Sequence, residues 1–158
     1  MKKIILLLAI TIFSIGCKTQ SPVSTKLDKK SEVAIKGNWT VSAVTYPSSE
    51  YIKINSFGIA DSKCFVGSTW KFISNNNKGN MALTKSDCTA FASDITWYIN
   101  KEGQFVMKFI EEGTKARKTK EGYILTVSNQ SENSFQLTDR DNIGGKSIEI
   151  IYTFQKAI

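Results

Sequence analysis

The fold of this chain is indicated most clearly by residues 94–111, DITWYINKEGQFVMKFIE. Apolar side chains recur at every second position on both sides of the polar segment Lys101–Gly103. They are Ile95, Trp97 and Ile99 before it, and Phe105, Met107 and Phe109 after it. A period of two places such side chains on one face of an extended strand, and a short polar turn that ends in glycine joins two strands into a hairpin. The stretch therefore predicts two antiparallel strands, 94–100 and 104–111.

The same alternation and the same β-forming residue types continue from Gly37 to the end of the chain. Six further strands are predicted, at 38–46, 68–75, 80–84, 122–128, 134–140 and 147–156. A short helical turn can form near Ile59–Phe65, and no long amphipathic helix is expected. The chain is therefore predicted to be all-β.

Loop lengths predict how the eight strands are connected. The connections 76–79, 101–103 and 129–133 are short and polar, whereas 47–67, 85–93, 112–121 and 141–146 are long. In an up-and-down sheet, alternate connections lie at the same end. The long connections therefore gather at one end, the mouth, and the short ones at the other, the floor. Eight such antiparallel strands close into a barrel. The alternative, a β-sandwich, requires Greek-key crossings that these short hairpins do not favour.

The N-terminal residues are typical of a secretory signal. Met1-Lys2-Lys3 precedes an apolar run, Ile4 to Ile15, that is too short to span a membrane as a helix. Ser14-Ile15-Gly16-Cys17 resembles the lipobox of bacterial lipoproteins. The resemblance implies that the signal peptide 1–16 is removed and that Cys17 carries lipid, which makes the membrane an expected partner. An ordinary cleaved signal followed by an incidental cysteine is the alternative.

The residues after Cys17 predict a linker and a location. Residues 18–36 are polar, poor in aromatic side chains and typical of a flexible tether. Lys18-Thr19-Gln20-Ser21 contains no acid, whereas early acids accompany surface export in the Bacteroidetes-type lipoproteins that this region resembles. The resemblance therefore implies a lipid-anchored envelope protein of the outer membrane that faces the periplasm. The expected organisation is a signal peptide at 1–16, a lipidated linker at 17–36 and a barrel domain at 37–158.

The cysteines fit an exported protein. The chain has three, and a lipid on Cys17 leaves Cys64 and Cys88. Both lie in long connections at the predicted mouth, and an exported chain meets an oxidising compartment. We expect a disulfide between them, with two separate buried thiols as the alternative.

A second resemblance concerns the start of the barrel. Gly37-Asn38-Trp39 matches the Gly-x-Trp motif of lipocalins, and Thr138-Asp139-Arg140 is similar to their Thr-Asp-Tyr motif. Residues 37–158 resemble the short bacterial lipocalin-like lipoproteins in strand number, motif and length. The resemblance implies a lipocalin-like barrel in which Gly37 and Trp39 are structural residues of the floor. In that family the tryptophan usually packs against a basic side chain.

Composition narrows the function classes. The chain contains no histidine, which excludes imidazole-based catalysis and His-ligated zinc. Neither remaining cysteine has the spacing of a metal site. We therefore predict a binding protein, not an enzyme, with no cofactor and no metal. The net charge of +7 is scattered along the chain and no nucleic-acid-binding motif accompanies it. A monomer is expected.

Two functions are consistent with these features. The first is a carrier whose aromatic lining holds a small hydrophobic or amphiphilic ligand, while Lys115 and Arg117 in the loop 112–121 meet an anionic head group. The predicted lining residues are Trp70, Phe72, Trp97, Phe105, Phe109, Phe135, Tyr152 and Phe154. The second is an envelope interaction or inhibitor module with a filled barrel and no small-molecule ligand. An open cavity supports the first function, and a filled interior supports the second.

Overall fold

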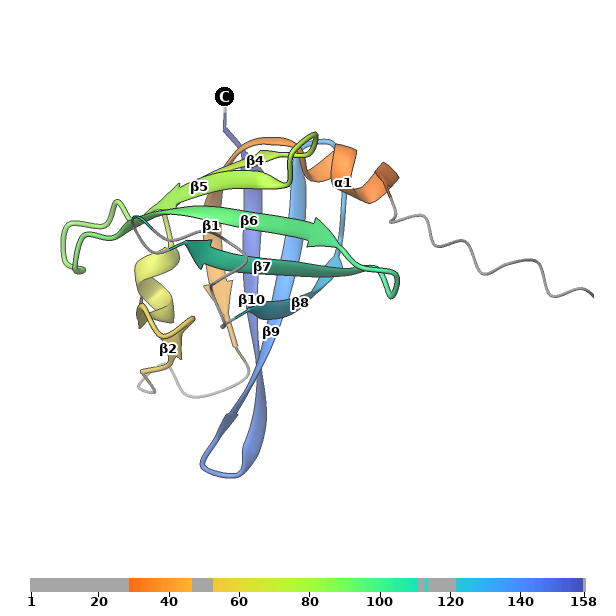
Figure 1. Cartoon of the computed structure of the whole chain (residues 1–158). Helices are drawn as coiled ribbons and strands as arrows, with labels where there is room; N and C mark the ends of the chain where they lie inside the picture. The colour runs from red at the N-terminus through yellow and green to blue at the C-terminus, as the bar shows by residue number, and fades with distance from the viewer. Residues whose placement is uncertain (1–28, 47–52, 111–112, 114–121, 158) are drawn as a thin grey trace, which may run out of the picture.

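A computed structural model of the protein describes residues 29–46, 53–110, 113 and 122–157 (Figure 1). Within these residues, two helical elements are present: α1 (Lys29–Ile35) and the 3-10 turn η1 (Ser62–Phe65). The strands are β1 (Gly37–Thr45), β2 (Asn55–Ser56), β3 (Ala60–Asp61), β4 (Thr69–Ile73), β5 (Lys78–Ala82), β6 (Ala92–Ile99), β7 (Gln104–Ile110), β8 (Tyr123–Ser128), β9 (Ser134–Ile143) and β10 (Lys146–Lys156). β2 and β3 form a separate small hairpin.

Eight strands form a closed antiparallel barrel in the order β1-β10-β9-β8-β7-β6-β5-β4. β1 closes the ring, because it pairs with β10 on one side and with β4 on the other. Apart from the pair β1 and β10, neighbouring strands of the barrel follow one another along the chain. The predicted eight-stranded up-and-down barrel is confirmed, and the sandwich alternative is wrong.

Side-chain alternation decides what enters the barrel. In β6, Ile95, Trp97 and Ile99 are at most 2% exposed, whereas the intervening Tyr98 is 41% exposed. Directly opposite Trp97 on β7 lies Met107, which is also buried. Burying each large apolar side chain stabilises the fold by roughly 1.5–3 kcal/mol. The interior of the barrel is therefore the hydrophobic core of the protein.

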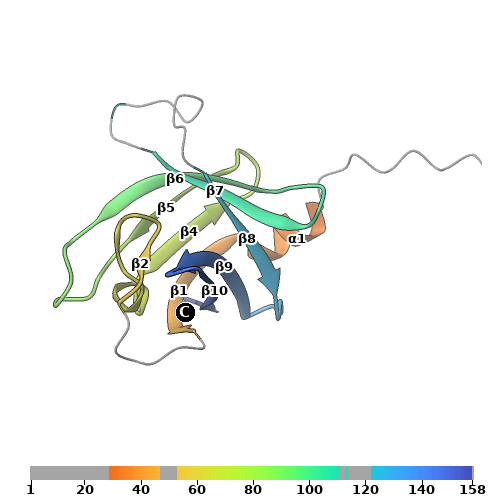
Figure 2. The same ribbon diagram turned by 90° about the horizontal axis from the view of Figure 1, so that it is seen from below.

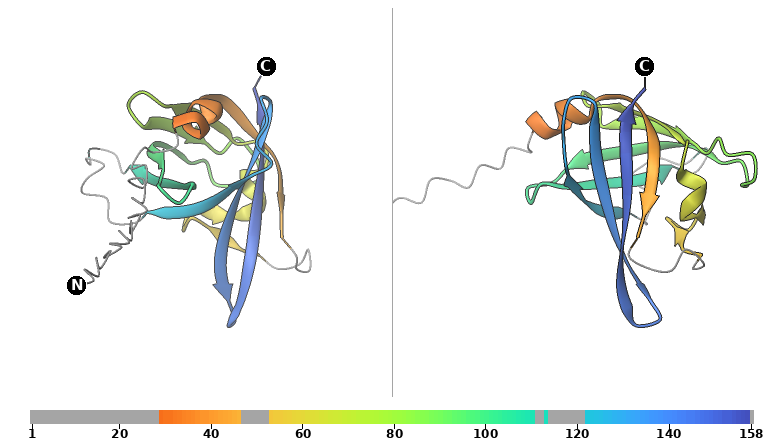
Figure 3. Two further views of the ribbon diagram at one scale, coloured as in Figure 1. Left: turned by 90° about the vertical axis from the view of Figure 1, so that its right-hand side faces the viewer. Right: turned by 180° about the vertical axis from the view of Figure 1, so that it is seen from behind.

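The ends of the barrel differ as the loop lengths predict, with one exception. The predicted long connection at 141–146 is wrong. β9 continues to Ile143 and β10 begins at Lys146, so the turn consists of Gly144 and Gly145. Their φ angles of 60° and 81° are ones that glycine adopts without strain and that match the twist of a two-residue hairpin. The two strands project beyond the rest of the barrel as a two-stranded ribbon (Figure 3).

Part of the predicted linker is ordered. Residues 29–35 form α1, which lies across the floor and buries Glu32 and Ile35. Glu32 Oε1 accepts a hydrogen bond of 3.2 Å from the backbone N–H of Ile99 at the floor end of β6. The sequence predicted a tether here because this segment is polar and one of its buried residues is an acid. Such a segment shows no clear helical periodicity of apolar residues.

The described part of the chain contains no helix with the length and apolar character needed to cross a membrane. The predicted signal peptide at 1–16, the lipidation site Cys17 and the first residues of the linker lie outside the described residues.

Candidate functional site

The floor half of the barrel is filled by aromatic side chains. Each of the predicted lining residues there is at most 2% exposed: Phe72, Trp97, Phe105, Phe135 and Phe154. The rings of Phe135 and Phe154 stack with their centroids 4.6 Å apart, and those of Trp97 and Phe105 stack at 5.5 Å. Side chains with almost no exposure have no water-sized space against them. This half is therefore a packed core, with density typical of protein interiors.

Gly37 and Trp39 lie at the floor, where the sequence motif places them. Gly37 has a φ of 134°, which favours glycine. Trp39 is 1% exposed, packs edge-on against Phe135 at 4.7 Å, and donates a hydrogen bond of 2.7 Å from Nε1 to the Ile35 carbonyl oxygen. The tryptophan therefore joins α1 to the barrel floor.

The mouth is covered by a segment of the connection between β1 and β4. This cap, residues 53–67, contains the β2–β3 hairpin and η1 and lies at the opposite end of the barrel from α1 (Figure 2). Phe57, between β2 and β3, is 6% exposed. Its ring lies 5.0–5.7 Å from the rings of Phe65, Phe109, Tyr123 and Tyr152. Phe57 thus occupies the place that a ligand in the mouth half would take.

The remaining predicted lining residues surround this position. Trp70 and Tyr152 are 3% and 2% exposed, and Phe109 is half-buried against Phe57. Phe57 and Tyr123 are not among the predicted lining residues, because Phe57 lies in a loop and Tyr123 lies at the start of a strand. The sequence Ser56-Phe57-Gly58 resembles a two-residue hairpin turn, and this was the available signal.

Side-chain links hold the cap on the barrel, besides the hydrogen bonds that join Gly67 at its end to Val41 and Thr84. Tyr152 Oη donates a hydrogen bond to Ser56 Oγ at 2.5 Å, and Tyr123 Oη donates one to the Phe57 carbonyl oxygen at 2.6 Å. A covalent link is the predicted disulfide between Cys64 and Cys88, which is confirmed and joins η1 to the connection between β5 and β6. None of these links requires the Phe57 ring.

Two local features make the cap less favourable than the core. Phe57 has a φ of 56°, in the left-handed region that a bulky residue adopts at a cost of roughly 1–2 kcal/mol. The hairpin is nevertheless closed by a hydrogen bond of 3.0 Å from Ile59 N–H to the Ser56 carbonyl oxygen. Ser62 is fully buried, and its hydroxyl has no hydrogen-bond partner within the described chain. Both features lower the cost of moving the cap.

The predicted cationic loop of the mouth is not part of the described chain, and the described mouth contains acidic residues. Lys115 and Arg117 lie outside the described residues. Asp139 pairs directly with the buried Ile150, so it lies on the inward face of β9. Burial raises the pKa of Asp139 above its ordinary value, and the nearby Asp141 carboxylate raises it further. Among the described residues, no three acidic or cysteine side chains group in a way that could hold a metal ion.

The sequence matches no protein-family model and no curated protein. Among solved structures, a complex of bovine odorant binding protein with a selenium-containing odorant is similar, with a TM-score of 0.48 and 12% identity over 80% of this chain and 73% of that chain. Bovine odorant binding protein complexed with its natural ligand has a TM-score of 0.46 and 14% identity, over 79% and 72%. Similarities at this level do not transfer a ligand or a site to this chain.

Proposed function

We propose that the protein is a lipid-anchored envelope protein that binds a small hydrophobic molecule in the mouth half of its barrel, in place of the Phe57 side chain. The observation that carries this proposal is the strained backbone conformation of Phe57, whose side chain is surrounded by other aromatic side chains. Backbone strain of this kind persists at positions that a functional rearrangement uses. Removal of the ring from the mouth would relieve the strain and open a space lined by Phe109, Tyr123 and Tyr152.

The filled floor half limits the size of the ligand. The space that Phe57 can vacate is about that of one aromatic ring or a short alkyl chain, so a long fatty-acid tail does not fit. An inward Asp139 favours a neutral or cationic polar group over a carboxylate inside the barrel. Outside the barrel, we propose that Lys115 and Arg117 contact a polar head group of the ligand. Because so little apolar surface is buried, affinities should lie between micromolar and millimolar.

The binding test compares the wild type with Phe57→Ala and with Phe105→Ala, a matched truncation in the floor half. Each is titrated with a panel of single-ring and short-chain compounds, and binding is followed by tryptophan fluorescence and native mass spectrometry. The wild type should bind members of the panel, and Phe57→Ala should bind the same members about tenfold more tightly, because the closed conformation no longer competes. Binding by Phe57→Ala alone would show that Phe57 is an ordinary core residue and would overturn the ligand proposal.

The anchoring part of the proposal rests on the lipobox resemblance at Cys17. It is tested by radiolabelled palmitate, which should enter the wild type and not Cys17→Ala. The described barrel begins at the floor, immediately after α1, so a lipid at Cys17 would hold the floor toward the membrane. A wild type that incorporates no palmitate would leave an ordinary secreted protein.

A second candidate function is favoured by the ribbon of β9 and β10. β8 pairs with β9 only as far as Thr138, and β1 pairs with β10 only from Ile151. Within the described residues, both outer edges of the ribbon are therefore without a neighbouring barrel strand. An unpaired edge can add a strand from another protein. Together with the filled floor half, this favours an interaction module. Reproducible co-purification of one envelope protein, lost when residues 140–149 are shortened, would support it over ligand binding.

A further inference from the structure

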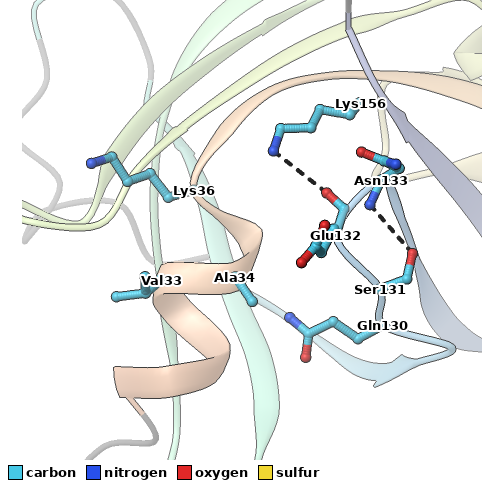
Figure 4. Close-up of a pocket in the computed structure, with 8 residues that line it drawn as sticks. All are labelled: Val33, Ala34, Lys36, Gln130, Ser131, Glu132, Asn133 and Lys156. Atoms are coloured by element: carbon cyan, nitrogen blue, oxygen red, sulfur yellow. Dashed lines mark hydrogen bonds between the residues drawn. The ribbon is translucent and has the colours of Figure 1, made fainter.

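A groove lies on the outside of the floor, between α1 and the turn Gln130–Asn133 (Figure 4). Its volume is about 550 Å³, and Lys36 and Lys156 are among its lining residues. Lys156 Nζ donates a hydrogen bond of 3.5 Å to the carbonyl oxygen of Glu132. The side chains of Val33 in α1 and of Lys36, which follows α1, point to the same side (Figure 4). The groove therefore combines an apolar helix surface with flanking ammonium groups.

The surface around the groove is apolar and basic. Val33 is 62% exposed, and Tyr98, near the floor end of β6, is 41% exposed. These are two of the three large apolar side chains that the described chain exposes to this extent. The exposed lysines at the floor are Lys36, Lys78, Lys101 and Lys156. The acids there are Glu102, Glu132 and the buried Glu32, so the cations outnumber the acids.

The described part of the mouth has acids beside its cations. In the described part of that end, Lys85 is paired with Asp87 at 3.3 Å and Arg140 with Glu149 at 2.8 Å. Asp139 and Asp141 add negative charge to the ribbon. Cations next to exposed apolar and aromatic side chains are the combination that binds membrane interfaces, where the apolar groups enter the headgroup region and the lysines meet phosphate. At the floor, Val33 and Tyr98 supply the exposed apolar side chains, and Lys36 and Lys156 are among the cations.

The chain also brings this surface close to the proposed anchor. Eleven residues, 18–28, separate Cys17 from the first residue of α1. A segment of this length spans at most about 40 Å when fully extended, and less in any other conformation. A lipid at Cys17 would therefore keep the floor within reach of the bilayer at a high local concentration.

We propose that the floor docks on a bilayer surface whose headgroups carry anionic phosphate, with Val33 at the headgroup level and Lys36 and Lys156 on the phosphates. This inference rests on the proposed anchoring at Cys17. Docking fixes the orientation of the barrel, so that the mouth and the ribbon face away from the membrane. In this proposal, α1 and the floor turns form a membrane-binding surface in addition to closing the floor of the barrel.

The test uses the full lipidated protein, reconstituted in phosphatidylcholine vesicles with or without phosphatidylglycerol. Flotation with the neutral vesicles measures the anchor alone. Docking is measured by lysine labelling with an amine-reactive ester and mass spectrometry. Labelling of Lys36 and Lys156 should fall about threefold or more when phosphatidylglycerol is present. Labelling of Lys53 and Lys146, which are exposed at the mouth end, should not change. High salt should restore the labelling of both floor lysines.

Charge reversal provides the second arm. Hydrogen exchange of the α1 amides should slow in the anionic vesicles for the wild type and for the matched mouth variant Lys53→Glu/Lys146→Glu. It should not slow for Lys36→Glu/Lys156→Glu, and unchanged thermal unfolding would show that this variant is folded. Equal labelling and exchange in both vesicles, with flotation intact, would overturn docking and leave the anchor. Failure to float with neutral vesicles would overturn the anchor and the orientation that docking requires.

Discussion

Tyr152 near the end of the last strand donates a hydrogen bond of 2.5 Å to Ser56 Oγ in the cap, and both residues are at most 2% exposed. The ring of Tyr152 also stacks on Phe57 at 5.2 Å. One side chain of the barrel wall therefore supports both the backbone of the cap and the residue that fills the mouth. Because the pair is buried, water cannot replace either partner when one is removed.

Tyr152→Phe tests this relationship. The substitution keeps the ring and leaves Ser56 Oγ without its donor, so the free energy of unfolding should fall by about 1–2 kcal/mol. Urea unfolding measures the change. Tyr98→Phe, at an exposed position, is the matched control and should have no effect. Equal stability of Tyr152→Phe and the wild type would show that the hydrogen bond does not hold the cap.

The same tyrosine predicts a loss of stability in alkali. Burial raises the pKa of Tyr152 far above its ordinary value, and Asp139 and Asp141 raise it further, although the Ser56 hydrogen bond lowers it. The unfolded chain loses the phenolic proton from about pH 10, whereas the folded chain keeps it. The free energy of unfolding should therefore be constant below about pH 10 and fall above it, less steeply in Tyr152→Phe. Chemical unfolding at several alkaline pH values measures both slopes.

Asp139→Asn tests the inward carboxylate of β9. Because burial raises the pKa of Asp139, the folded protein loses stability as the pH rises through the ordinary carboxyl range and Asp139 ionises. The asparagine does not ionise. The melting temperature of Asp139→Asn should therefore exceed that of the wild type at about pH 7 and equal it at about pH 3. Asp94→Asn, at an exposed site, serves as the control. A difference of the same size at both pH values would assign the effect to packing instead of charge.

The backbone strain at Phe57 predicts an unusual order of stability for two variants at this position. Both Phe57→Ala and Phe57→Gly lose the packing of the ring, about 3 kcal/mol or more. At ordinary positions the glycine variant is the less stable of the two by roughly 0.5–1 kcal/mol. With a φ of 56°, the glycine variant should instead be the more stable, because it alone adopts this conformation freely.

Urea unfolding of the two Phe57 variants measures their order. Phe91→Ala and Phe91→Gly provide the comparison, since Phe91 is a half-buried aromatic residue that is not among the residues with positive φ. The Phe91 pair should show the ordinary order. The same order at both positions would remove strain from the description of the cap.

Alternation of apolar and polar side chains made the barrel predictable from sequence, because only one face of each strand is buried and side chains such as Trp97 and Phe105 lie on it. It could not define every strand end. The predicted strand at 80–84 starts too late, because a glycine at position 79 disfavours a strand in the local sequence. In the structure, β5 begins at Lys78. In the barrel, Gly79 is needed: a Cβ there would overlap the Lys71 carbonyl oxygen and press on Ile95. That constraint comes from neighbouring strands and cannot be seen in the local sequence.

The site was less predictable than the fold. The aromatic residues chosen as a lining lie inward, but alternation fixes only the direction of a side chain and not the space that remains beside it. Phe72 contacts Trp97, Phe105, Phe135 and Phe154, so the rings fill the volume they were expected to enclose. Phe57 reaches the mouth from a loop, whose path depends on the cap as a whole and not on a periodic pattern.

The disulfide provides the last prediction. Cys64 and Cys88 are 24 positions apart in the sequence, and closing a loop of that size stabilises the folded state by about 3 kcal/mol in the chain-entropy model. Cys64→Ser/Cys88→Ser should lower the free energy of unfolding by about this amount and should make residues 53–67 the first site of limited proteolysis, because η1 is then held only by its packing and by hydrogen bonds of the cap. Urea unfolding and peptide mapping measure the two effects. The wild type in reductant should match the double variant, which is the control for the serine side chains. A double variant as stable as the oxidised wild type would show that the packing of Phe57 and Phe65, and not the covalent link, keeps the cap on the mouth.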